Sequence, residues 1–309
     1  MPPIRPRHQS LFQTIVRQRQ LVFMSVFIMA YVVLFTYVPL WGWTMAFQNY
    51  RPGKAFSDQV WVGFQWFETL FSDDQFLMVI RNTLAMSVIN IALGFSTAIL
   101  VALLLNEVKF SPFKRTIQTL SYLPHFLSWV IVAGLVGNLL ASDGVVNAVL
   151  MGLGLLDEPF QWLGDPNSFW GIVGITNVWK EVGWNSIIYL AAISSVDPSL
   201  YEAAAIDGAG RFRKMGAITL PSIRPVIIVL LIMSVGHALD AGFELQYLLG
   251  NGPNQETSQT IDVFVVVFGL NSGNYSMAAA AGIFKSVVSI VLLFAANQLA
   301  RRLGEERLL

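Results

Sequence analysis

The chain has 309 residues, of which 55% are hydrophobic and only 12% are charged, whereas an ordinary soluble domain carries about a quarter charged residues. Its net charge is zero, so charge gives no indication of a nucleic-acid partner. It contains no cysteine and only three scattered histidines, which excludes a disulfide framework and leaves a metal centre unsupported. The composition indicates an integral membrane protein.

Long apolar segments predict six membrane-spanning helices. Each is roughly 20 residues or longer, enough to cross about 30 Å of hydrocarbon as a helix. The predicted spans are residues 21–43, 78–105, 117–140, 169–196, 226–249 and 277–299. Two shorter apolar segments, 145–156 and 261–270, are predicted to be interfacial or re-entrant helices at the outer face. The predicted fold class is an all-α membrane protein with one transmembrane domain over residues 21–300.

The distribution of lysine and arginine predicts the orientation, because positive charge is retained in cytoplasmic loops. Fourteen of the 19 basic residues fall in the N-terminal arm, the second-to-third loop, the fourth-to-fifth loop and the C-terminal tail. The opposite loops carry only Arg51 and Lys54. Both termini, the arm of residues 1–20 and the tail of residues 301–309, are therefore expected in the cytoplasm.

The loop between the fourth and fifth predicted spans, residues 197–221, is the most informative segment. Ser199 and Glu202 form a capping-box pattern, in which each side chain satisfies a free backbone N–H at the start of a helix. Gly208 then permits a sharp break, and Pro221 is expected to mark the start of the next spanning helix. The pattern predicts a short helix, a turn and a second helix on the cytoplasmic face. The alternative is an ordinary connecting loop.

This loop resembles the signature of ABC-importer permeases, in which Glu-Ala-Ala is followed after three residues by Gly and after nine more by Ile-x-Leu-Pro. The residues that meet these positions are Glu202, Ala203, Ala204, Gly208, Ile218, Leu220 and Pro221. The resemblance implies that the loop is a coupling helix that docks into a groove on an ATPase subunit. The residues then expected to couple to the ATPase are Tyr201, Glu202, Ala203, Ala204, Asp207, Gly208, Ala209, Arg211 and Phe212.

The resemblance extends beyond the loop, from about residue 21 to the C-terminus. Short segments follow the order seen in carbohydrate-type permeases, and look most like the branch that imports oligosaccharides and, in one case, the acidic polysaccharide alginate. These segments are Pro39-Leu40-Trp41-Gly42, Ala46-Phe47-Gln48-Asn49-Tyr50, Trp61-Val62-Gly63 and Arg81-Asn82-Thr83-Leu84. The fold implied is the six-helix core of type I ABC importers, with the first helix embracing a partner permease.

The resemblance also implies partners and a location. The expected partners are a second homologous permease, two ATPase subunits and an extracytoplasmic solute-binding protein, assembled in the bacterial cytoplasmic (inner) membrane. The chain contains no G-x-x-x-x-G-K-[ST] sequence, so ATP and magnesium are expected on the ATPase subunits, with no cofactor and no enzymatic activity here. The expected function is ATP-driven import of an oligo- or polysaccharide by alternating access.

Polar residues inside the predicted spans are candidates for the substrate path, because such residues are costly in a membrane and usually face a cavity or a partner. Aromatic faces and planar polar groups suit sugars. His237, Asp240 and Glu244 are expected to share a helix face by their i, i+3, i+4 spacing. The candidates are Asn177, Trp179, Lys180, Glu181, Trp184, Asn185, His237, Asp240, Phe243, Glu244 and Tyr247. The alternative is that they pair with one another or with a partner subunit.

Two questions stay open from the sequence. Arg81 and Lys285 are expected to be anchors or interhelical pairs, yet with Lys180, His125 and His237 they could also favour an acidic solute; the neighbouring acidic residues argue the other way. A secondary transporter driven by an ion gradient and an intramembrane transferase are the rival functions. Neither requires the Glu-Ala-Ala loop, and no nucleophile–base pattern accompanies the acid–base candidates.

Overall fold

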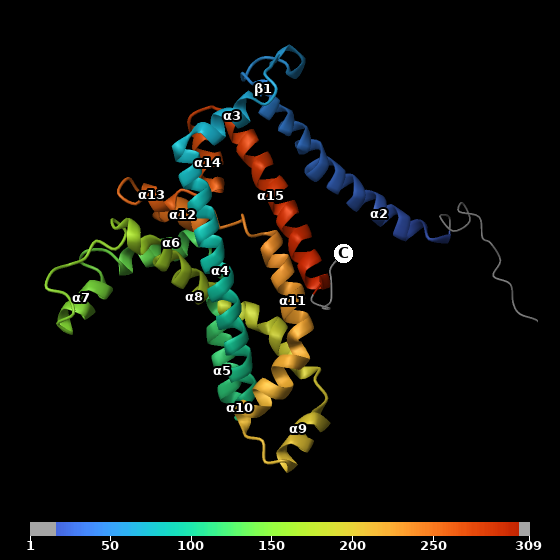
Figure 1. The fold of residues 1–309 in the computed structure, drawn as a ribbon, viewed down its shortest axis with the longest axis vertical. Coiled ribbons are helices and arrows are strands. Elements are labelled where there is room, and N and C mark those ends of the chain that lie inside the picture. The colour runs from blue at the N-terminus through green and yellow to red at the C-terminus, as the bar shows by residue number, and fades with distance from the viewer. Residues whose placement is uncertain (1–16, 303–309) are drawn as a thin grey trace, which may run out of the picture.

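The computed structural model describes residues 17–302, so most of the expected cytoplasmic arm and tail lies outside the described residues. Long helices run side by side and form an elongated bundle, from which the first helix projects (Figure 1). Within the described part, four helices are long and apolar enough to cross a membrane, and a bent helix pair makes up to five. Helix α8, Pro166–Ser194, is of similar length but carries Lys180 and Glu181 near its middle.

The predicted first, second and sixth spans are continuous helical segments, as expected. Their bounds are α2 Arg19–Val32 continued by η1 Val33–Tyr37 and η2 Val38–Phe47, α4 Asp74–Glu107, and α15 Tyr275–Arg302. No residue of α2 is buried, and its apolar side chains surround the helix on every side. Its partner surface therefore lies outside this chain, in lipid or in another subunit.

The third span was wrongly predicted as one straight helix over residues 117–140. The chain forms α5 Ser111–Tyr122, η4 Leu123–Phe126 and α6 Trp129–Leu139, and the two halves are bent by 102°. Proline at position 124 has no N–H to continue the α-helical pattern. Ser128 then adopts an extended conformation, and its hydroxyl accepts from the backbone N–H of Ile131 at 3.3 Å, which starts a new helix.

The fifth span, predicted over residues 226–249, is broken. Its helix is α11 Leu220–Gly236, and the next helix, α12 Glu244–Leu249, starts only after an irregular segment over residues 237–243. The backbone of this segment is satisfied by neighbouring elements: Ser87 of α4 donates to Ala238 O. Gly242 has φ +95°, a conformation that L side chains rarely adopt, and makes the turn possible.

The start of the fifth span was also predicted too late. Helix α10 Arg211–Lys214 continues through the π turn η5 Met215–Thr219 into α11, so that one helix runs from Arg211 to Gly236. Pro221 lies in the first turn of α11, as expected, although helical structure already begins at Arg211. The π turn directly precedes this proline, whose missing N–H interrupts the regular α-helical bonding.

Short elements connect and flank the long helices (Figure 1). The two short apolar segments predicted at 145–156 and 261–270 form helices of their own, as expected. These and the remaining elements are β1 Gln48–Asn49, η3 Phe56–Asp58, β2 Val60–Trp61, α3 Gln65–Ser72, α7 Val145–Gly152, α13 Gln255–Ser258, α14 Ile261–Val266 and η6 Val267–Asn271. Strands β1 and β2 pair antiparallel with Gln48 opposite Trp61.

Helices α4 and α8 pack along each other and form the centre of the molecule (Figure 1). Three apolar clusters follow this pair from end to end. One is centred on Phe76 and Phe264, one on Phe169 and Met86, and one on Tyr189 with its neighbours in α4 and α11. Members of these clusters, including Phe95 and Tyr189, also line the cavities described next.

Candidate functional site

A short helix, α9 Pro198–Ile206, lies at the far end of the bundle, beyond the ends of the long helices (Figure 1). Asp197 caps it, because its carboxylate accepts from the backbone N–H of Ser199 at 2.9 Å. The predicted capping box of Ser199 and Glu202 is therefore wrong: the helix starts at the proline, so the residue before it takes the cap position. Hydrogen bonds from the backbone N–H and the side chain of Ser199 hold the pKa of Asp197 below its ordinary value of 3.8.

The turn after α9 forms as the glycines predict. Gly208 has φ +74°, and the amide of Ala209 donates back to Ala204 O at 2.8 Å. Gly210 is extended and leads into α10. The expected short helix, turn and second helix is thus confirmed.

The exposed surface of this loop carries apolar side chains at its tip and basic side chains next to them. Ile206 is 88% exposed and Phe212 is 82% exposed. Glu202, Ala203, Asp207, Gly208 and Arg211 are also exposed, whereas Ala204 and Ala209 are half-buried. Ile206 was missed by the sequence reasoning, although an isoleucine between a short helix and a glycine turn was a signal that could have found it. Exposed apolar tips of this kind suit insertion into a groove of another protein.

Tyr201 has a different position from the other coupling candidates. It is half-buried, and its hydroxyl lies 3.0 Å from Thr219 Oγ1 at the base of the fifth span. This contact ties α9 to the helix that runs from Arg211 to Gly236. Tyr201 is therefore placed to link the loop to the span rather than to meet an external groove.

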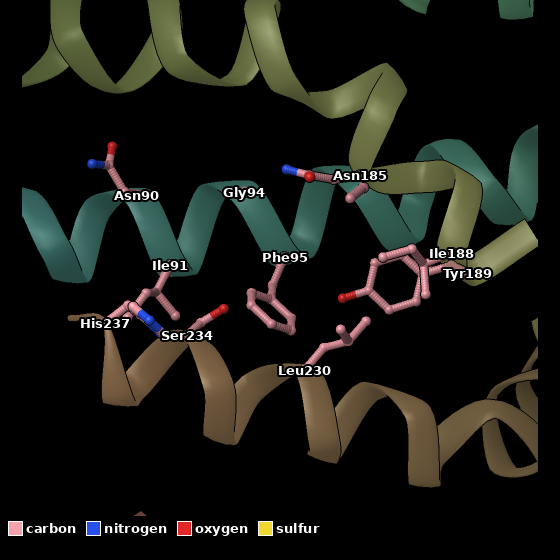
Figure 2. A pocket seen from close by; sticks show the side chains of 11 residues that line it. Asn90, Ile91, Gly94, Phe95, Asn185, Ile188, Tyr189, Leu230, Ser234 and His237 are labelled. Carbon is pink, nitrogen blue, oxygen red and sulfur yellow. The ribbon is translucent and has the colours of Figure 1, made fainter. Parts of the chain in front are cut away.

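Two polar cavities lie between α4, α8 and the broken fifth span. The first, of about 290 Å³, is lined from α4 by Asn90 and Phe95, from α8 by Asn185 and Tyr189, and from the fifth span by His237 and its neighbours (Figure 2). The second, of about 240 Å³, shares Asn90 and Asn185 with the first. Its lining also includes Asn177, Glu181, Val182, Asp240 and Gly242.

The structure thus gathers five of the eleven substrate-path candidates at these cavities: Asn177, Glu181, Asn185, His237 and Asp240. The expected common helix face of His237, Asp240 and Glu244 is wrong, because the helix ends at Gly236. Asn90 was missed. It accepts from Asn177 Nδ2 at 2.9 Å, and an amide inside an otherwise apolar span was the signal for it.

The other six candidates lie away from these two cavities. Trp179 and Trp184 are partly exposed on α8, and Glu244 is exposed at the start of α12. Phe243 and Tyr247 stack on each other with their ring centroids 5.1 Å apart. Lys180 is buried beside Trp129.

One cavity carboxylate belongs to a closed ionic cluster at the bend of the third span. Glu181 Oε2 lies 2.7 Å from His125 Nδ1, and Glu181 Oε1 lies 3.1 Å from Lys180 Nζ. Lys180 also donates to His125 O at 2.7 Å. Trp184 stacks on the His125 ring at 4.4 Å with the planes nearly parallel. The cluster fastens the bend to α8 and confirms that Lys180 pairs with Glu181.

The second cavity carboxylate is paired as well. Lys285 of α15 lies 2.5 Å from Asp240 and 2.6 Å from Asp262 of α14. Arg81 donates to Glu256 O at 3.1 Å and lies over the Trp170 ring. Lys285 and Arg81 each bind groups on other elements, so their expected roles as anchors or interhelical pairs are confirmed. Among residues 17–302, no three potential metal ligands come together.

Comparisons with known proteins agree with this architecture. Residues 90–305 match the family described as binding-protein-dependent transport system inner membrane component. Over 303 residues the chain is 43% identical to the polygalacturonan/rhamnogalacturonan transport system permease protein YteP of Bacillus subtilis (strain 168), with 98% of this chain and 94% of the relative covered.

Solved structures of similar chains extend the comparison to the fold. A chain of a bacterial alginate ABC transporter, in complex with an alginate pentasaccharide-bound periplasmic protein, is 41% identical with a TM-score of 0.87, covering 96% of this chain and 98% of that one. A chain of a bacterial ABC transporter involved in the import of the acidic polysaccharide alginate is 41% identical with a TM-score of 0.88, covering 95% and 99%. The chain therefore belongs to the family of binding-protein-dependent transport system inner membrane components, and it has the type I permease fold of carbohydrate-type ABC importers.

Proposed function

We propose that this chain is the transmembrane permease subunit of an ATP-driven importer of a uronate-containing oligo- or polysaccharide, working by alternating access. The observation that carries the proposal is the exposed helix α9, which bears the family's Glu-Ala-Ala sequence and projects beyond the spanning helices. Exposing Ile206 and Phe212 on such a projection does not stabilise the helix bundle itself. An ATPase groove would cover them.

A mechanical path joins this projection to the cavities. Tyr201 links α9 to Thr219, and Thr219 belongs to the 26-residue helix from Arg211 to Gly236. At 1.5 Å per residue that helix is about 39 Å long. Its far end leads directly into residues 237–243, which line both cavities through His237 and Asp240. A displacement of α9 would therefore move the cavity wall, which is the coupling that alternating access requires.

The neutralised cavity walls support an acidic solute. The names of the similar proteins refer to polygalacturonan, rhamnogalacturonan and alginate, which are polymers that contain carboxylated sugars. Glu181 faces Lys180 and His125, and Asp240 faces Lys285. Acidic residues beside the path therefore do not form an unpaired negative field that would repel such a solute. The amides of Asn90, Asn177 and Asn185 offer hydrogen bonds to its hydroxyl groups.

The assembly proposed is the one expected from the sequence: a second homologous permease, two ATPase subunits carrying ATP and magnesium, and an extracytoplasmic solute-binding protein, in the cytoplasmic membrane with both termini cytoplasmic. The wholly exposed apolar surface of α2 supports contact with a partner permease or lipid. A secondary transporter remains the rival function. Uptake that follows an ion gradient without any ATPase would favour it.

The first test is a mild-detergent pull-down of the tagged chain from its native membrane, with mass spectrometry of the proteins that co-purify. Recovery of an ATPase and a second permease is expected, followed by ATP-dependent uptake of trigalacturonate in proteoliposomes with the binding protein. A chain that purifies alone and transports alone would refute the proposal.

The coupling role has its own test in the reconstituted importer. Glu202→Lys and Gly208→Val are expected to leave the permease pair assembled while uncoupling ATP hydrolysis from uptake, because the first reverses a charge on the docking surface and the second strains a left-handed turn. Glu158→Lys, an exposed charge reversal in the third-to-fourth loop, is the matched control and should transport normally. Normal uptake by both loop variants would count against docking.

A further inference from the structure

Some of the basic residues near the cavities are already held by protein groups. Lys180 is only 4% exposed, and its ammonium group is shared between His125 O and Glu181. His125 is held between the Glu181 carboxylate and the Trp184 ring. Moving Lys180 toward a solute would take a buried ammonium group away from its partners, which is strongly destabilising, and moving His125 would break its contacts with Glu181 and Trp184. Neither group is free to bind an anion that passes through the cavities.

Arg81 and His237 are also poorly placed for this task. The guanidinium group of Arg81 is bound to Asn82 Oδ1 and Glu256 O, and neither of these partners lines a cavity. His237 lines the first cavity, but its Nδ1 lies 2.9 Å from Met233 O of its own helix. Of the five basic groups considered from the sequence, Lys285 remains.

Lys285 has one fixed partner and one exposed partner. Its side chain is 18% exposed and is held by Asp262 at 2.6 Å, whose side chain is 27% exposed. The other partner, Asp240 at 2.5 Å, is 51% exposed and belongs to the irregular segment that lines the second cavity. Lys285 itself lines neither cavity, whereas Asp240 contacts Lys285 and lines the second cavity from the irregular segment 237–243.

We propose that Lys285 is the carboxylate receptor of the solute path. When an anionic sugar enters the cavity, its carboxylate replaces Asp240 on the Lys285 ammonium group, while Asp262 keeps that group in place. This inference rests on the proposed function, because it specifies how the importer selects uronates over neutral sugars.

The exchange keeps the Lys285 ammonium group paired throughout. Lys285 keeps two carboxylate partners before and after, so no buried positive charge is left alone. The released Asp240 is already half exposed and can be hydrated in the cavity. A neutral sugar cannot replace a carboxylate on an ammonium group, because hydrogen bonds between charged groups are the stronger ones. The Asp240–Lys285 ion pair therefore stays intact when a neutral solute enters the cavity.

The exchange also has a mechanical consequence. The Asp240–Lys285 pair joins residues 237–243 to α15, and the same residues end the helix that starts at the coupling loop. Breaking the pair releases this segment from the sixth span. Binding of an acidic solute thereby loosens the end of the helix that the ATPase moves.

The experiment compares trigalacturonate with the same trimer methyl-esterified at all carboxyl groups, in the complete reconstituted importer. Loading of each on the binding protein is measured separately, and uptake is compared at saturating loading. Wild type should prefer the acid by about tenfold, in proportion to one charged hydrogen-bonding contact. Asp240→Asn should keep this preference, since Lys285 remains held by Asp262.

The double variant Lys285→Met with Asp262→Asn removes the receptor without leaving the less exposed carboxylate unpaired. Its preference should fall to about one, an approximately tenfold loss. Glu158→Lys, the exposed charge reversal in the third-to-fourth loop, is the control and should retain the preference. If the double variant fails to assemble, amide exchange of residues 237–243 in the wild-type complex decides: the acid trimer, but not its ester, should speed it.

Several results would overturn the inference. A double variant that still prefers the acid would reduce Lys285 to a structural tie, and an Asp240→Asn variant that loses the preference would transfer the role to Asp240. Equal amide exchange of residues 237–243 with the acid trimer and its ester would also overturn the inference. A wild-type complex whose ATPase responds to its loaded binding protein, but which prefers the ester, refutes the receptor and the acidic solute while the importer assignment stands. A complex without that ATPase response refutes the importer itself.

Discussion

The contact between α5 and α8 at Gly183 offers a quantitative test of the packing around the bent third span. A Cβ atom added at Gly183 would lie 2.1 Å from Ser121 O and 2.4 Å from Ser121 C, whereas ordinary contact begins at 3.4 Å. The obstructing atoms are backbone and cannot rotate away. Gly183→Ala should therefore push α5 away from α8 by more than 1 Å.

The cost of this displacement follows from what α5 carries. Overpacking of a tight contact costs about 1–3 kcal/mol. The shift also stretches the 2.7 Å hydrogen bond from Lys180 to His125 O just beyond α5, and a hydrogen bond to a charged group is worth about 1.5–3 kcal/mol. Alanine regains up to about 1 kcal/mol of helix propensity. The net loss in the free energy of unfolding should be about 3 kcal/mol.

The assay is thermal unfolding of the purified complex in detergent, followed by tryptophan fluorescence. A loss of about 3 kcal/mol should lower Tm by about 5 °C in a chain of this size. Gly171→Ala in the same helix is the matched control, because its added Cβ meets no atom within 4 Å. A Gly183→Ala variant that melts together with Gly171→Ala would refute the close packing of α5 on α8.

Further predictions concern the two loops. Asp197→Ala should weaken the α9 cap and lower binding-protein-stimulated ATP hydrolysis, whereas Asp197→Asn keeps an acceptor for the Ser199 N–H. Because folding lowers the pKa of Asp197, the stabilisation that its ionised carboxylate gives the folded state is complete above the unfolded-state pKa of 3.8. This stabilisation is lost as the pH falls through the lower, folded-state pKa, so uptake should not change with the ionisation of Asp197 between about pH 6 and 8. Asn147→Ala should destabilise the outer loop by about 1–3 kcal/mol for each buried group left unpaired, and the N–H groups of Phe160 and Trp162 both lose their acceptor. Limited proteolysis of the loop with a Tm measurement checks this, and unchanged cleavage would contradict it.

Much of the architecture was predictable because it depends on local sequence. Apolar length alone predicted the first, second and sixth spans and the two short outer helices, and the glycine at position 208 predicted the turn after α9. The spacing from Glu202 to Pro221 indicated the family, since a motif is read along the chain without knowledge of packing. Within the coupling loop, the cap residue and the start of the fifth span were misplaced, each because of a feature of the helix itself.

The bend in the third span and the break in the fifth were decided by tertiary structure. A hydropathy pattern records only that residues are apolar, and it cannot show whether the backbone stays helical. An irregular backbone at membrane depth is tolerated when other elements satisfy its polar groups. Here Ser87 of α4 binds Ala238 O, and Gln246 of α12 binds Ala241 O at 2.6 Å.

The cavities and their charges likewise depend on residues far apart in the sequence. Glu181 meets His125 across 56 positions of the chain, and Asp240 meets Lys285 only because α15 returns beside the broken span. The sequence by itself determined the family, most of the spans and many of the polar side chains within them. Only the packed structure decided which of those side chains neutralise one another and which face a cavity, because electrostatic pairing depends on distance in space.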